Sequence, residues 1–260
     1  MIIKAFDYLF YRIFTPHRKG FGIHSPFVYQ IISEILIKKD DLYLTGIKEW
    51  RNFLMQKNDF LSTIDAGAGS IAHQEKKRSV SSIIKRSSIS HKYGRILYYM
   101  AKEFKPETIL ELGTGLGIST AYLAGGNLRA KLYSIDTDMV KVNFAEKVLQ
   151  ILEIPPPVII NGMFENVLLS NLESATHPIM IFVDGDHQYE SLLRIYNDII
   201  KYKRFDTIII FDDIRWSKGM LKAWNEIKDH QSSVISIDLF FMGIIFFREG
   251  ILKQNFKINF

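Results

Sequence analysis

Three glycines at alternate positions could build a cofactor site. Gly113, Gly115 and Gly117 follow a short apolar run and precede a run with helical spacing. Glycine permits the tight turn between a strand and a helix, and it lets a ligand approach the backbone closely. The spacing is GxGxG, whereas the dinucleotide form GxGxxG would need glycine where Ile118 stands. This turn, with Thr114 inside it, is therefore a candidate site for a cofactor other than a dinucleotide.

Acidic residues on either side of this turn indicate the charge of the cofactor. Glu111 precedes the turn, and Asp136 ends the next predicted strand, where a carboxylate can accept both hydroxyls of a ribose. Glu111 would repel a pyrophosphate but suits a cofactor that carries an ammonium and a sulfonium. Ser119, in the first helical turn, can offer its hydroxyl and its backbone N–H to a carboxylate of the cofactor. A purely structural glycine turn is the alternative, and these acids disfavour it.

Two later segments place carboxylates at the ends of predicted strands. Asp184 follows Ile179–Val183, and Asp212 and Asp213 follow Thr207–Phe211. The carboxyl ends of parallel strands meet at one edge of a sheet, about 5 Å apart between neighbours. Ionised carboxylates that converge there repel one another unless a cation lies among them. Oxygen ligands suit Mg²⁺ or Ca²⁺, and such an ion would also acidify a substrate hydroxyl.

Other interpretations of this acidic region stay open. Asp186 could cap a helix that begins near His187, and Asp213 could cap the helix after Trp216. The acids could also hold the cationic end of the cofactor without any metal. His187 could take the proton of a substrate hydroxyl at neutral pH, or it could only orient a carboxylate.

The residues from Thr108 onward alternate between short apolar runs and amphipathic helical stretches. Continuous apolar strands that alternate with helices predict an α/β fold, with a parallel sheet covered on both faces. Ser233–Phe240 and Met242–Arg248 lie too close together for a crossover helix, so we expect them to form an antiparallel hairpin. The other predicted strands are Thr108–Leu112, Lys131–Ile135, Val158–Asn161, Ile179–Val183 and Thr207–Phe211.

The first 105 residues differ from the rest of the chain. Apolar spacing predicts helices in Ile2–Phe14, Phe27–Ile37 and Ile96–Phe104, and the polar stretch Ala66–Ser90 is interpreted as a loop or lid. We therefore expect residues 1–89 to form a helical extension or lid, and residues 90–260 to form the domain that binds the cofactor.

Composition narrows the class of protein. With 47% hydrophobic and 23% charged residues, the chain is typical of globular proteins rather than disordered ones. The absence of cysteine excludes disulfides and a cysteine nucleophile, and it fits a reducing cytoplasm. No apolar run is long enough to span a bilayer, so we expect a soluble cytoplasmic protein.

The charge is unevenly distributed. Residues 1–105 carry a net charge of +9 and the remainder carries −4. We expect a solvated basic face and no nucleic-acid partner, because no aromatic–basic motif is present. A weak contact with a membrane surface and a homodimer formed through the N-terminal region are further options.

The segments ELGTGLGIST, SIDTD, FVDGDHQYES and IIFDDIRW, in this order, resemble the class I S-adenosylmethionine-dependent methyltransferases. They are similar in particular to the branch of catechol and caffeoyl-CoA O-methyltransferases and to bacterial relatives with a VDGDHxY signature. The resemblance covers about Ser90–Arg248. It implies S-adenosylmethionine as cofactor. The fold that it implies is Rossmann-like, with a mainly parallel seven-stranded sheet that ends in an antiparallel C-terminal hairpin.

The resemblance also implies roles for the acidic strand ends. In that family, the aspartate after the fourth strand and an Asp-Asn pair after the fifth bind a divalent metal. The matching positions here are Asp184, Asp212 and Asp213, so an aspartate replaces the asparagine. The catalytic lysine of the family corresponds to His187. Metal-assisted methylation of a hydroxyl, with His187 and Asp184 as catalytic residues, is the reaction that follows.

The remaining cofactor contacts are also implied by the resemblance. Asp136 and Ser119 match the acid of the second strand and the serine of the first helix, and Gly162 and Met163 match the region that contacts adenine. The expected function is methylation of a small-molecule hydroxyl with S-adenosylmethionine, assisted by Mg²⁺ or Ca²⁺. Two alternatives stay open: a metal-independent N-methyltransferase, and a non-catalytic protein with this fold that acts through its basic N-terminal region.

Overall fold

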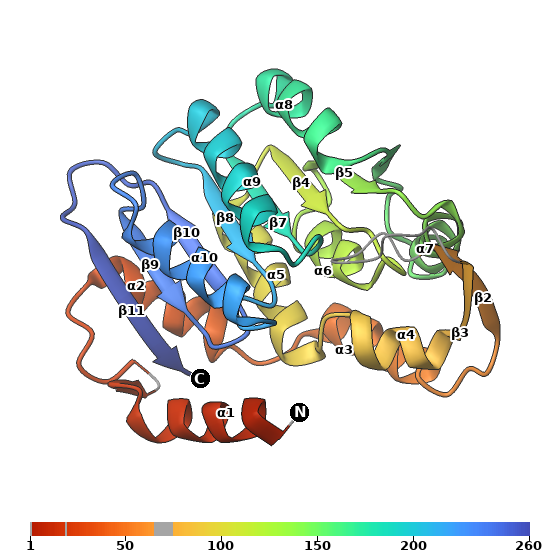
Figure 1. The fold of residues 1–260 in the computed structure, drawn as a ribbon, viewed down its shortest axis with the longest axis horizontal. Helices are drawn as coiled ribbons and strands as arrows, with labels where there is room; N and C mark the ends of the chain where they lie inside the picture. Colours follow the sequence, from red (N-terminus) through yellow and green to blue (C-terminus); the bar gives the residue numbers. More distant parts are fainter. Residues whose placement is uncertain (1, 19, 65–74) are drawn as a thin grey trace. The chain divides into compact units, whose positions relative to one another are not determined.

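The computed structural model describes residues 2–18, 20–64 and 75–260, and it confirms the predicted mixture of strands and helices (Figure 1). The chain divides into two units. Lys39–Asp186 is called the glycine-turn unit because it contains Gly113–Gly117. Met1–Lys38 together with His187–Phe260 is called the acidic-loop unit because it contains Asp212 and Asp213.

The glycine-turn unit is built on parallel strands in the order β7-β4-β5-β6. Every residue of β4 and β7 is buried, which explains why these strands read as continuous apolar runs. In the register of β4 and β5, Glu111 lies opposite Ser134. The strand bounds are β4 Thr108–Leu112, β5 Lys131–Asp136, β6 Val158–Asn161 and β7 Ile179–Val183.

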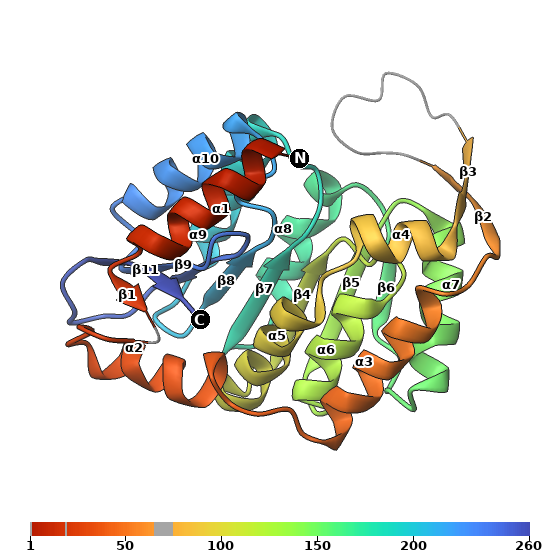
Figure 2. The same cartoon turned by 90° about the horizontal axis from the view of Figure 1, so that it is seen from below.

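Helices complete this unit. The helices α5 and α6 pack against each other and lie side by side in front of β4 and β5 in Figure 2. Asp41 caps α3 by accepting the N–H of Leu44 at 3.0 Å, and it also accepts the hydroxyl of Tyr98 on α5 at 2.7 Å. The Asp41 carboxylate thus caps the N-terminus of α3 and also links α3 to α5 by a hydrogen bond. The helix bounds are α3 Leu42–Leu54, α4 Val80–Ser87, α5 His91–Phe104, α6 Ile118–Gly126, α7 Met139–Ile151 and α8 Phe164–Ser174.

The predicted loop Ala66–Ser90 is wrong in its second part. Glu75–Ser79 forms β3, which pairs antiparallel with β2, Phe60–Ile64, and α4 follows directly. The helix forms because the Ser79 side chain accepts the N–H of Ser82, while Val80, Ile83 and Ile84 are buried at helical spacing. Because the surrounding sequence is rich in Ser and Lys, this apolar spacing was not recognised in the sequence. Residues 65–74, which begin the predicted loop, lie outside the described residues.

The acidic-loop unit contains strands in the order β8-β10-β9-β11-β1. Strand β10 pairs antiparallel with both β8 and β9, which confirms the predicted hairpin. Strands β11 and β1 were not predicted; β11 is parallel to β9, and β1 is parallel to β11. The bounds are β1 His17–Arg18, β8 Ile208–Phe211, β9 Ile235–Asp238, β10 Gly243–Phe246 and β11 Gln254–Asn259.

Helices cover both faces of these strands. In both views α9 and α10 lie together on one face and α2 on the other (Figures 1 and 2). Phe27 of α2 meets Phe246 of β10 edge-on at 5.0 Å. Among the described residues, no helix is both long and apolar enough to cross a membrane. The bounds are α1 Ile2–Phe14, α2 Pro26–Ile31, the π-helix η1 Ile32–Leu36, α9 Tyr189–Tyr202 and α10 Lys218–Asp229.

Candidate functional site

The glycine turn joins β4 to α6, and its glycines have different surroundings. At Gly113, with φ +111°, a Cβ atom would lie 2.1 Å from the carbonyl oxygen of Asp184. At Gly117, with φ +80°, it would lie 2.9 Å from the Cβ of Ala145. At Gly115, with φ +52°, it would meet no atom within 4 Å. Gly113 and Gly117 therefore let the turn pack against its own unit, whereas Gly115 faces open space that a ligand can occupy.

Asp136 is held beside this turn by backbone donors. Its Oδ2 accepts the N–H of Gly115 at 2.9 Å, and its Oδ1 accepts the N–H of Asp138 at 2.9 Å. Each carboxylate oxygen can accept more than one hydrogen bond, so both retain acceptor capacity. The carboxylate therefore has a fixed orientation and can still receive the hydroxyls of a ribose.

Glu111 is fully buried at the centre of a network of hydroxyl groups. Its Oε2 accepts the hydroxyls of Thr120 and Ser134, each at 2.6 Å. The Ser134 oxygen also lies 2.6 Å from that of Thr114. Because the single proton of Ser134 is given to Glu111, Thr114 must be the donor to Ser134. Thr120 and Ser134 were not predicted, although the pairing of β4 with β5 places Ser134 opposite Glu111.

The other oxygen of Glu111, Oε1, is a buried acceptor without a hydrogen-bond partner among the described residues. Burial raises the pKa of Glu111 to about 7, the nearby hydroxyls of Ser119, Ser134 and Thr120 oppose the shift, and the charge of Asp136 adds to it. A buried carboxyl with an unused acceptor is suited to an ammonium group, which would favour its ionised form.

Three other predicted cofactor residues lie in the same unit. Ser119 is in the first turn of α6, whose N-cap residue Gly117 supplies no side-chain oxygen, so the N–H groups at this helix end lack a side-chain cap. Gly162 donates its N–H to the carbonyl of Asp136 at 3.2 Å, next to the predicted ribose position. Met163, at the N-cap of α8, is 60% exposed.

Asp184 follows β7 and touches the glycine turn. Its N–H donates to the carbonyl of Leu112 at 2.8 Å, and its own carbonyl is the atom that excludes a side chain at Gly113. The interpretation of Asp186 as a helix cap is wrong: α9 begins at Tyr189, and its N-cap residue is Gln188. Asp186 instead has a left-handed backbone, with φ +45°.

Residues 212–217, called the acidic loop, follow β8 and bring an acid pair close to a histidine. Asp212 Oδ1 accepts the N–H of Asp213 at 2.9 Å, and Asp213 has φ +51°. Burial raises the pKa of Asp212 to about 7, and the charge of Asp213 adds to that shift. His187 Nε2 lies 3.8 Å from Asp213 Oδ2, and its ring centre lies 5.6 Å from that of Trp216. The structure thus brings together three residues that were singled out from the sequence.

Asp213 does not cap the following helix, so that interpretation is wrong as well. The N-cap residue of α10 is Ser217, whose side chain accepts the N–H of Met220 at 3.1 Å. The carbonyl of Asp213 accepts the N–H of Trp216 at 2.7 Å. Its carboxylate therefore remains on the side of His187.

An ion pair that the sequence did not reveal anchors the acidic loop. Arg215 donates from two nitrogens to the two oxygens of Asp238, at 2.8 and 2.7 Å, and also to the carbonyl of Phe240 at 2.7 Å. The Asp238 side chain is only 5% exposed, and it also accepts the indole N–H of Trp224 at 3.3 Å. Arg215 belongs to the DDIRW segment and Asp238 ends β9, but no spacing rule pairs them. This bidentate ion pair attaches the acidic loop to the end of β9.

The predicted metal ligands are divided between the units. Asp184 lies in the glycine-turn unit, and Asp212 and Asp213 lie in the acidic-loop unit. Within the part of the chain that the structure describes, no group of three or more His, Cys, Asp or Glu side chains is placed to hold a metal ion. The three-carboxylate site for Mg²⁺ or Ca²⁺ stays a prediction.

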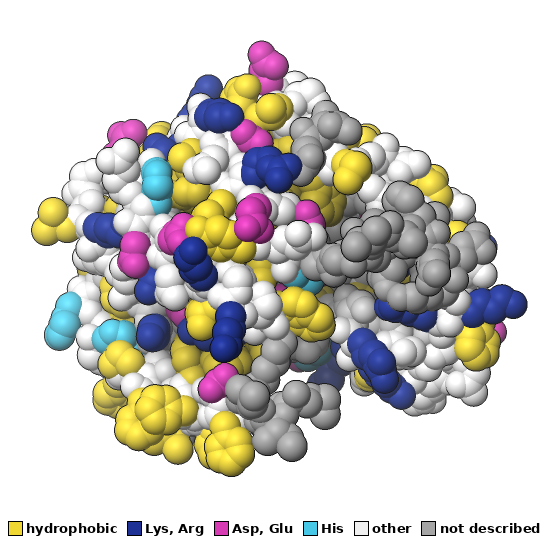
Figure 3. All heavy atoms as spheres, viewed as in Figure 1, with side chains coloured by type: hydrophobic (Ala, Val, Ile, Leu, Met, Phe, Trp, Pro, Cys, Tyr) yellow, Lys and Arg dark blue, Asp and Glu magenta, His cyan; other side chains and the backbone are white. Residues whose placement is uncertain are grey.

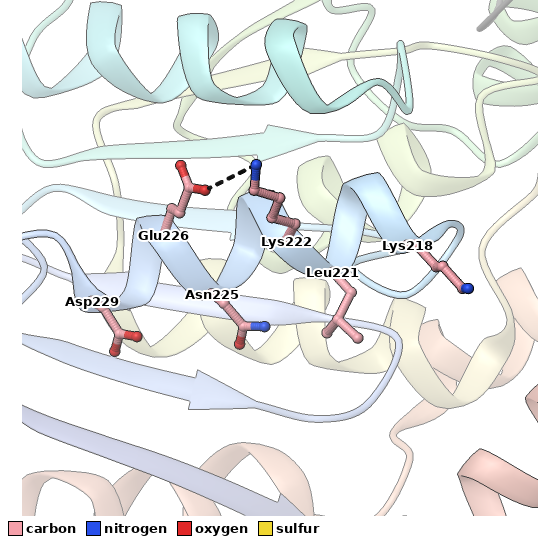
Figure 4. Close-up of a pocket in the computed structure, with 6 residues that line it drawn as sticks. All are labelled: Lys218, Leu221, Lys222, Asn225, Glu226 and Asp229. Carbon is pink, nitrogen blue, oxygen red and sulfur yellow. Dashed lines mark ion pairs between the residues drawn. The ribbon is translucent and has the colours of Figure 1, made fainter.

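An open hollow on the surface of α10 is a different kind of feature (Figure 4). Lys222 and Glu226 form an ion pair across it at 3.9 Å, and Tyr189 donates its hydroxyl to Glu226 at 2.9 Å. Its described lining comes from this one helix and includes none of the predicted site residues. Lys222 and Glu226 point to one side of α10, and the other lining side chains point elsewhere. We therefore do not assign the hollow a catalytic role. The lining residues are Lys218, Leu221, Lys222, Asn225, Glu226 and Asp229.

Comparison with protein families and curated proteins gives two matches. Residues 110–214 match a family described as a methyltransferase domain. A segment of 51 residues is 39% identical to the uncharacterized protein R132 of Acanthamoeba polyphaga mimivirus. That match covers 18% of this chain and spans 23% of the viral protein.

Solved structures of methyltransferases share the fold over most of their length. The methyltransferase PaMTH1 of Podospora anserina, bound to S-adenosylhomocysteine (SAH), has a TM-score of 0.58 at 13% identity, over 87% of this chain and 97% of that one. An O-methyltransferase from Bacillus cereus in complex with SAH has a TM-score of 0.55 at 16% identity, over 84% and 96%. The O-methyltransferase TomG of Streptomyces achromogenes, in complex with S-adenosylmethionine, has a TM-score of 0.54 at 15% identity, over 84% and 96%.

The fold and the matched domain agree with each other. The structural likeness extends over most of the chain, and the matched residues 110–214 include the glycine turn, Asp136, Asp184, His187 and the acid pair. The chain thus contains a segment that matches a methyltransferase domain, and it shares its fold with solved methyltransferases.

Proposed function

We propose that this chain transfers the methyl group of S-adenosylmethionine to a hydroxyl oxygen of a small molecule. The observation that supports it most is the pair of fixed carboxylates around a turn that is open at Gly115. Glu111 has an unused buried oxygen, and Asp136 is oriented by two backbone N–H groups. Together they suit a ligand with a cationic end and a ribose.

Each cofactor residue has a task in this proposal. Glu111 receives the ammonium, the backbone N–H of Ser119 receives the carboxylate, and Asp136 receives the ribose hydroxyls. Thr114 contributes only its backbone, because its hydroxyl donates inward to Ser134. Gly162 and Met163 contact the adenine. When bound, S-adenosylmethionine supplies a methyl group activated by its sulfonium.

Activation of the acceptor is assigned to His187 and the acid pair of the acidic loop. His187, next to the carboxylate of Asp213, would take the proton of the acceptor hydroxyl. Asp184, Asp212 and Asp213 would hold a divalent cation such as Mg²⁺ or Ca²⁺, which would bind and acidify that hydroxyl. The raised pKa of Asp212 beside Asp213 supports this assignment, because a cation would relieve the repulsion between the two carboxylates.

Calorimetric titration of the protein with SAH tests the cofactor part. We expect binding by the wild-type chain and a loss of affinity of about tenfold or more in Asp136→Ala, because hydrogen bonds to a charged group are removed. Glu146→Ala is the matched control, since this exposed acid lies on the neighbouring helix α7. A wild-type chain that does not bind SAH would contradict the proposal.

Transfer of a labelled methyl group to a panel of hydroxyl and amine acceptors tests the reaction. Activity on hydroxyls that disappears with a chelator and returns with Mg²⁺ would support the metal. Activity that persists under chelation would remove the metal from the proposal. Methylation of amines alone would favour the N-methyltransferase. SAH binding with no turnover on either class would favour the non-catalytic alternative.

Several expectations about the whole chain stay predictions. They are the domain boundary at residue 90, the lid role of residues 1–89, a cytoplasmic location, the absence of a nucleic-acid partner and a homodimer formed through the N-terminal region. The lack of cysteine supports a reducing compartment.

A further inference from the structure

The N-terminal helix α1 is fixed to the acidic-loop unit by two tyrosines on one side. The ring of Tyr8 lies 4.9 Å from that of Phe240 and 5.9 Å from that of Phe241. Tyr11 donates its hydroxyl to the carbonyl of Asp238 at 2.6 Å, and the guanidinium of Arg215 lies 5.4 Å from its ring. These contacts determine which side of α1 faces outward.

The outward side of α1 carries a continuous apolar band, with the exposed charged residues Asp7 and Arg12 at its borders. The residues of this band follow the helical spacing i, i+3, i+4, i+7 and i+8, and each of them is 53–70% exposed. Figure 3 shows hydrophobic side chains gathered where Figure 1 places α1. These residues, called the apolar stripe, are Phe6, Leu9, Phe10, Ile13 and Phe14.

This orientation is the reverse of the usual one. A helix on the surface of a globular protein normally turns such a stripe toward the core. Here the stripe exposes on the order of 600 Å² of apolar surface, taking about 150–250 Å² for each whole aromatic side chain. Isolated exposed residues need no explanation, but a continuous patch of this size is typical of an interaction surface.

The sequence of the N-terminal segment has an excess of basic residues, which favours an anionic partner. The first 21 residues contain Lys4, Arg12, Arg18 and Lys19 against the single acid Asp7. Arg12 lies on α1 itself and is exposed. Amphipathic helices with an aromatic and aliphatic face and nearby cations bind to the headgroup region of anionic bilayers.

A second copy of the chain fits this surface less well. A stable protein interface buries about 800 Å² on each partner, which is more than the stripe offers. Contact between two copies through α1 would also bring like charges together.

We propose that α1 docks the protein on an anionic lipid surface. The apolar stripe enters the boundary between headgroups and acyl chains, and Arg12 lies among the lipid phosphates. This inference rests on the exposed side chains and on the charges of the N-terminal segment. It can therefore be tested independently of the methyl-transfer reaction.

Sedimentation of the full chain with lipid vesicles tests the inference. We expect binding to vesicles of phosphatidylcholine mixed with phosphatidylglycerol, and several-fold weaker binding to phosphatidylcholine alone. High salt should reduce the preference for the anionic vesicles, because it screens the cations.

Variants distinguish vesicle binding through the apolar stripe from nonspecific binding by exposed apolar side chains. The triple variant Phe6→Ser/Phe10→Ser/Phe14→Ser should bind anionic vesicles about tenfold more weakly or worse, because the apolar area that inserts is lost. Leu252→Ser is the matched control: it removes a side chain that is 86% exposed in the same unit, and it should bind as the wild type does. Arg12→Glu should reduce the preference for anionic lipid. SAH affinity and the melting temperature show that each variant remains folded.

Three results would overturn the inference. The first is a wild-type chain that binds neither kind of vesicle. The second is a triple variant that binds as well as the wild type. The third is a dimer, seen by analytical ultracentrifugation, that the triple variant dissociates while the wild type ignores vesicles; this would assign the stripe to contact between copies.

Discussion

The glycine turn and the acidic loop both carry carboxylates at or near the ends of strands, but they differ in the number of hydrogen bonds that those carboxylates accept. Around the turn, Asp136 is held by two backbone N–H groups, and Glu111 accepts two hydroxyls. In the acidic loop, Asp212 accepts one N–H and stands next to another carboxylate, Asp213. The turn is organised by hydrogen bonds before any ligand binds. The loop retains a repulsion that a proton or a cation would relieve.

This difference separates two kinds of function. A network of hydrogen bonds gives a rigid binding site, because each group is oriented in advance. Clustered like charges reduce stability, and they are typical of sites where protons or cations take part in chemistry. We therefore expect substitutions at the turn to change folding or cofactor affinity. Substitutions in the loop should change stability and methyl transfer without changing cofactor affinity.

The largest effect is expected from Gly113→Ala. A Cβ there would lie 2.1 Å from a backbone oxygen, and φ of +111° is accessible to glycine almost alone. We expect a loss of more than about 4 kcal/mol in the free energy of unfolding, measured by urea denaturation. Gly115→Ala is the matched control: its Cβ meets open space, so it should lose only about 1–2 kcal/mol from its left-handed backbone.

The same pair of variants also tests the position of the cofactor. Gly115→Ala should remain folded but bind SAH more weakly, because the methyl group enters the space assigned to the ligand. Equal stability of the two alanine variants would contradict the description of the turn. Unchanged SAH affinity in Gly115→Ala would contradict the placement of the cofactor.

The second effect concerns the anchor of the acidic loop. Arg215→Met removes the partner of Asp238, whose side chain is only 5% exposed, and leaves a buried carboxylate without its cation. We expect a loss of about 3–4 kcal/mol in the free energy of unfolding. Methyl transfer should fall, while the affinity for SAH should stay within about threefold of the wild type because the turn is intact. Arg129→Met, at an exposed position, is the control.

The contrast between the regions also explains what the sequence could predict. The strands Thr108–Leu112 and Ile179–Val183 were predicted with the bounds that the structure shows, because a fully buried strand is apolar throughout. Strand β3, with the sequence EKKRS, has no such pattern. Strand β11 does alternate, with Phe256 and Ile258 between polar residues, but four of its six residues are polar. Strands made mostly of polar residues are therefore hard to recognise in a sequence.

The candidate site shows the same limit. Glycine spacing and acids at strand ends were sufficient to select Glu111 and Asp136, because these signals are local. The partners of Glu111 were not visible: Thr120 and Ser134 lie 9 and 23 residues away, and only the strand register brings Ser134 opposite. The partner of Arg215 is 23 residues away along the chain. Residues that support a site are fixed by the tertiary fold rather than by local spacing.

The third effect is a dependence of stability on pH that comes from Glu111. Its pKa is raised by burial from 4.5 to about 7, so the folded state binds the proton more tightly than the unfolded state. This contribution to stability is fully present below pH 4.5, is lost as the pH rises to about 7, and is then constant. Glu111→Gln lacks this loss, so at pH 8 it should exceed the wild type by up to about 3 kcal/mol.

Urea denaturation of both proteins at pH 5 and pH 8 isolates this effect, because other titrating groups cancel in the difference between them. The variant should also bind SAH more weakly at pH 8, since the ammonium loses its carboxylate. A stability gain without a loss of affinity would place the cofactor's ammonium elsewhere. A variant that is less stable at both pH values would show that the hydrogen bonds to the Glu111 carboxylate compensate for its burial.

The smallest effect is expected from Asp212→Asn. The amide keeps an oxygen that can accept the N–H of Asp213, but it removes one of two adjacent negative charges. We expect a gain of about 1–2 kcal/mol at neutral pH, measured by urea denaturation, together with a loss of methyl transfer. In the wild-type chain, added Mg²⁺ should raise the melting temperature, because an ion that binds only the folded state stabilises it. The variant should not respond to the ion. A loss of stability in Asp212→Asn would mean that the charge of Asp212 stabilises the acidic loop. The contrast with the glycine turn would then fail.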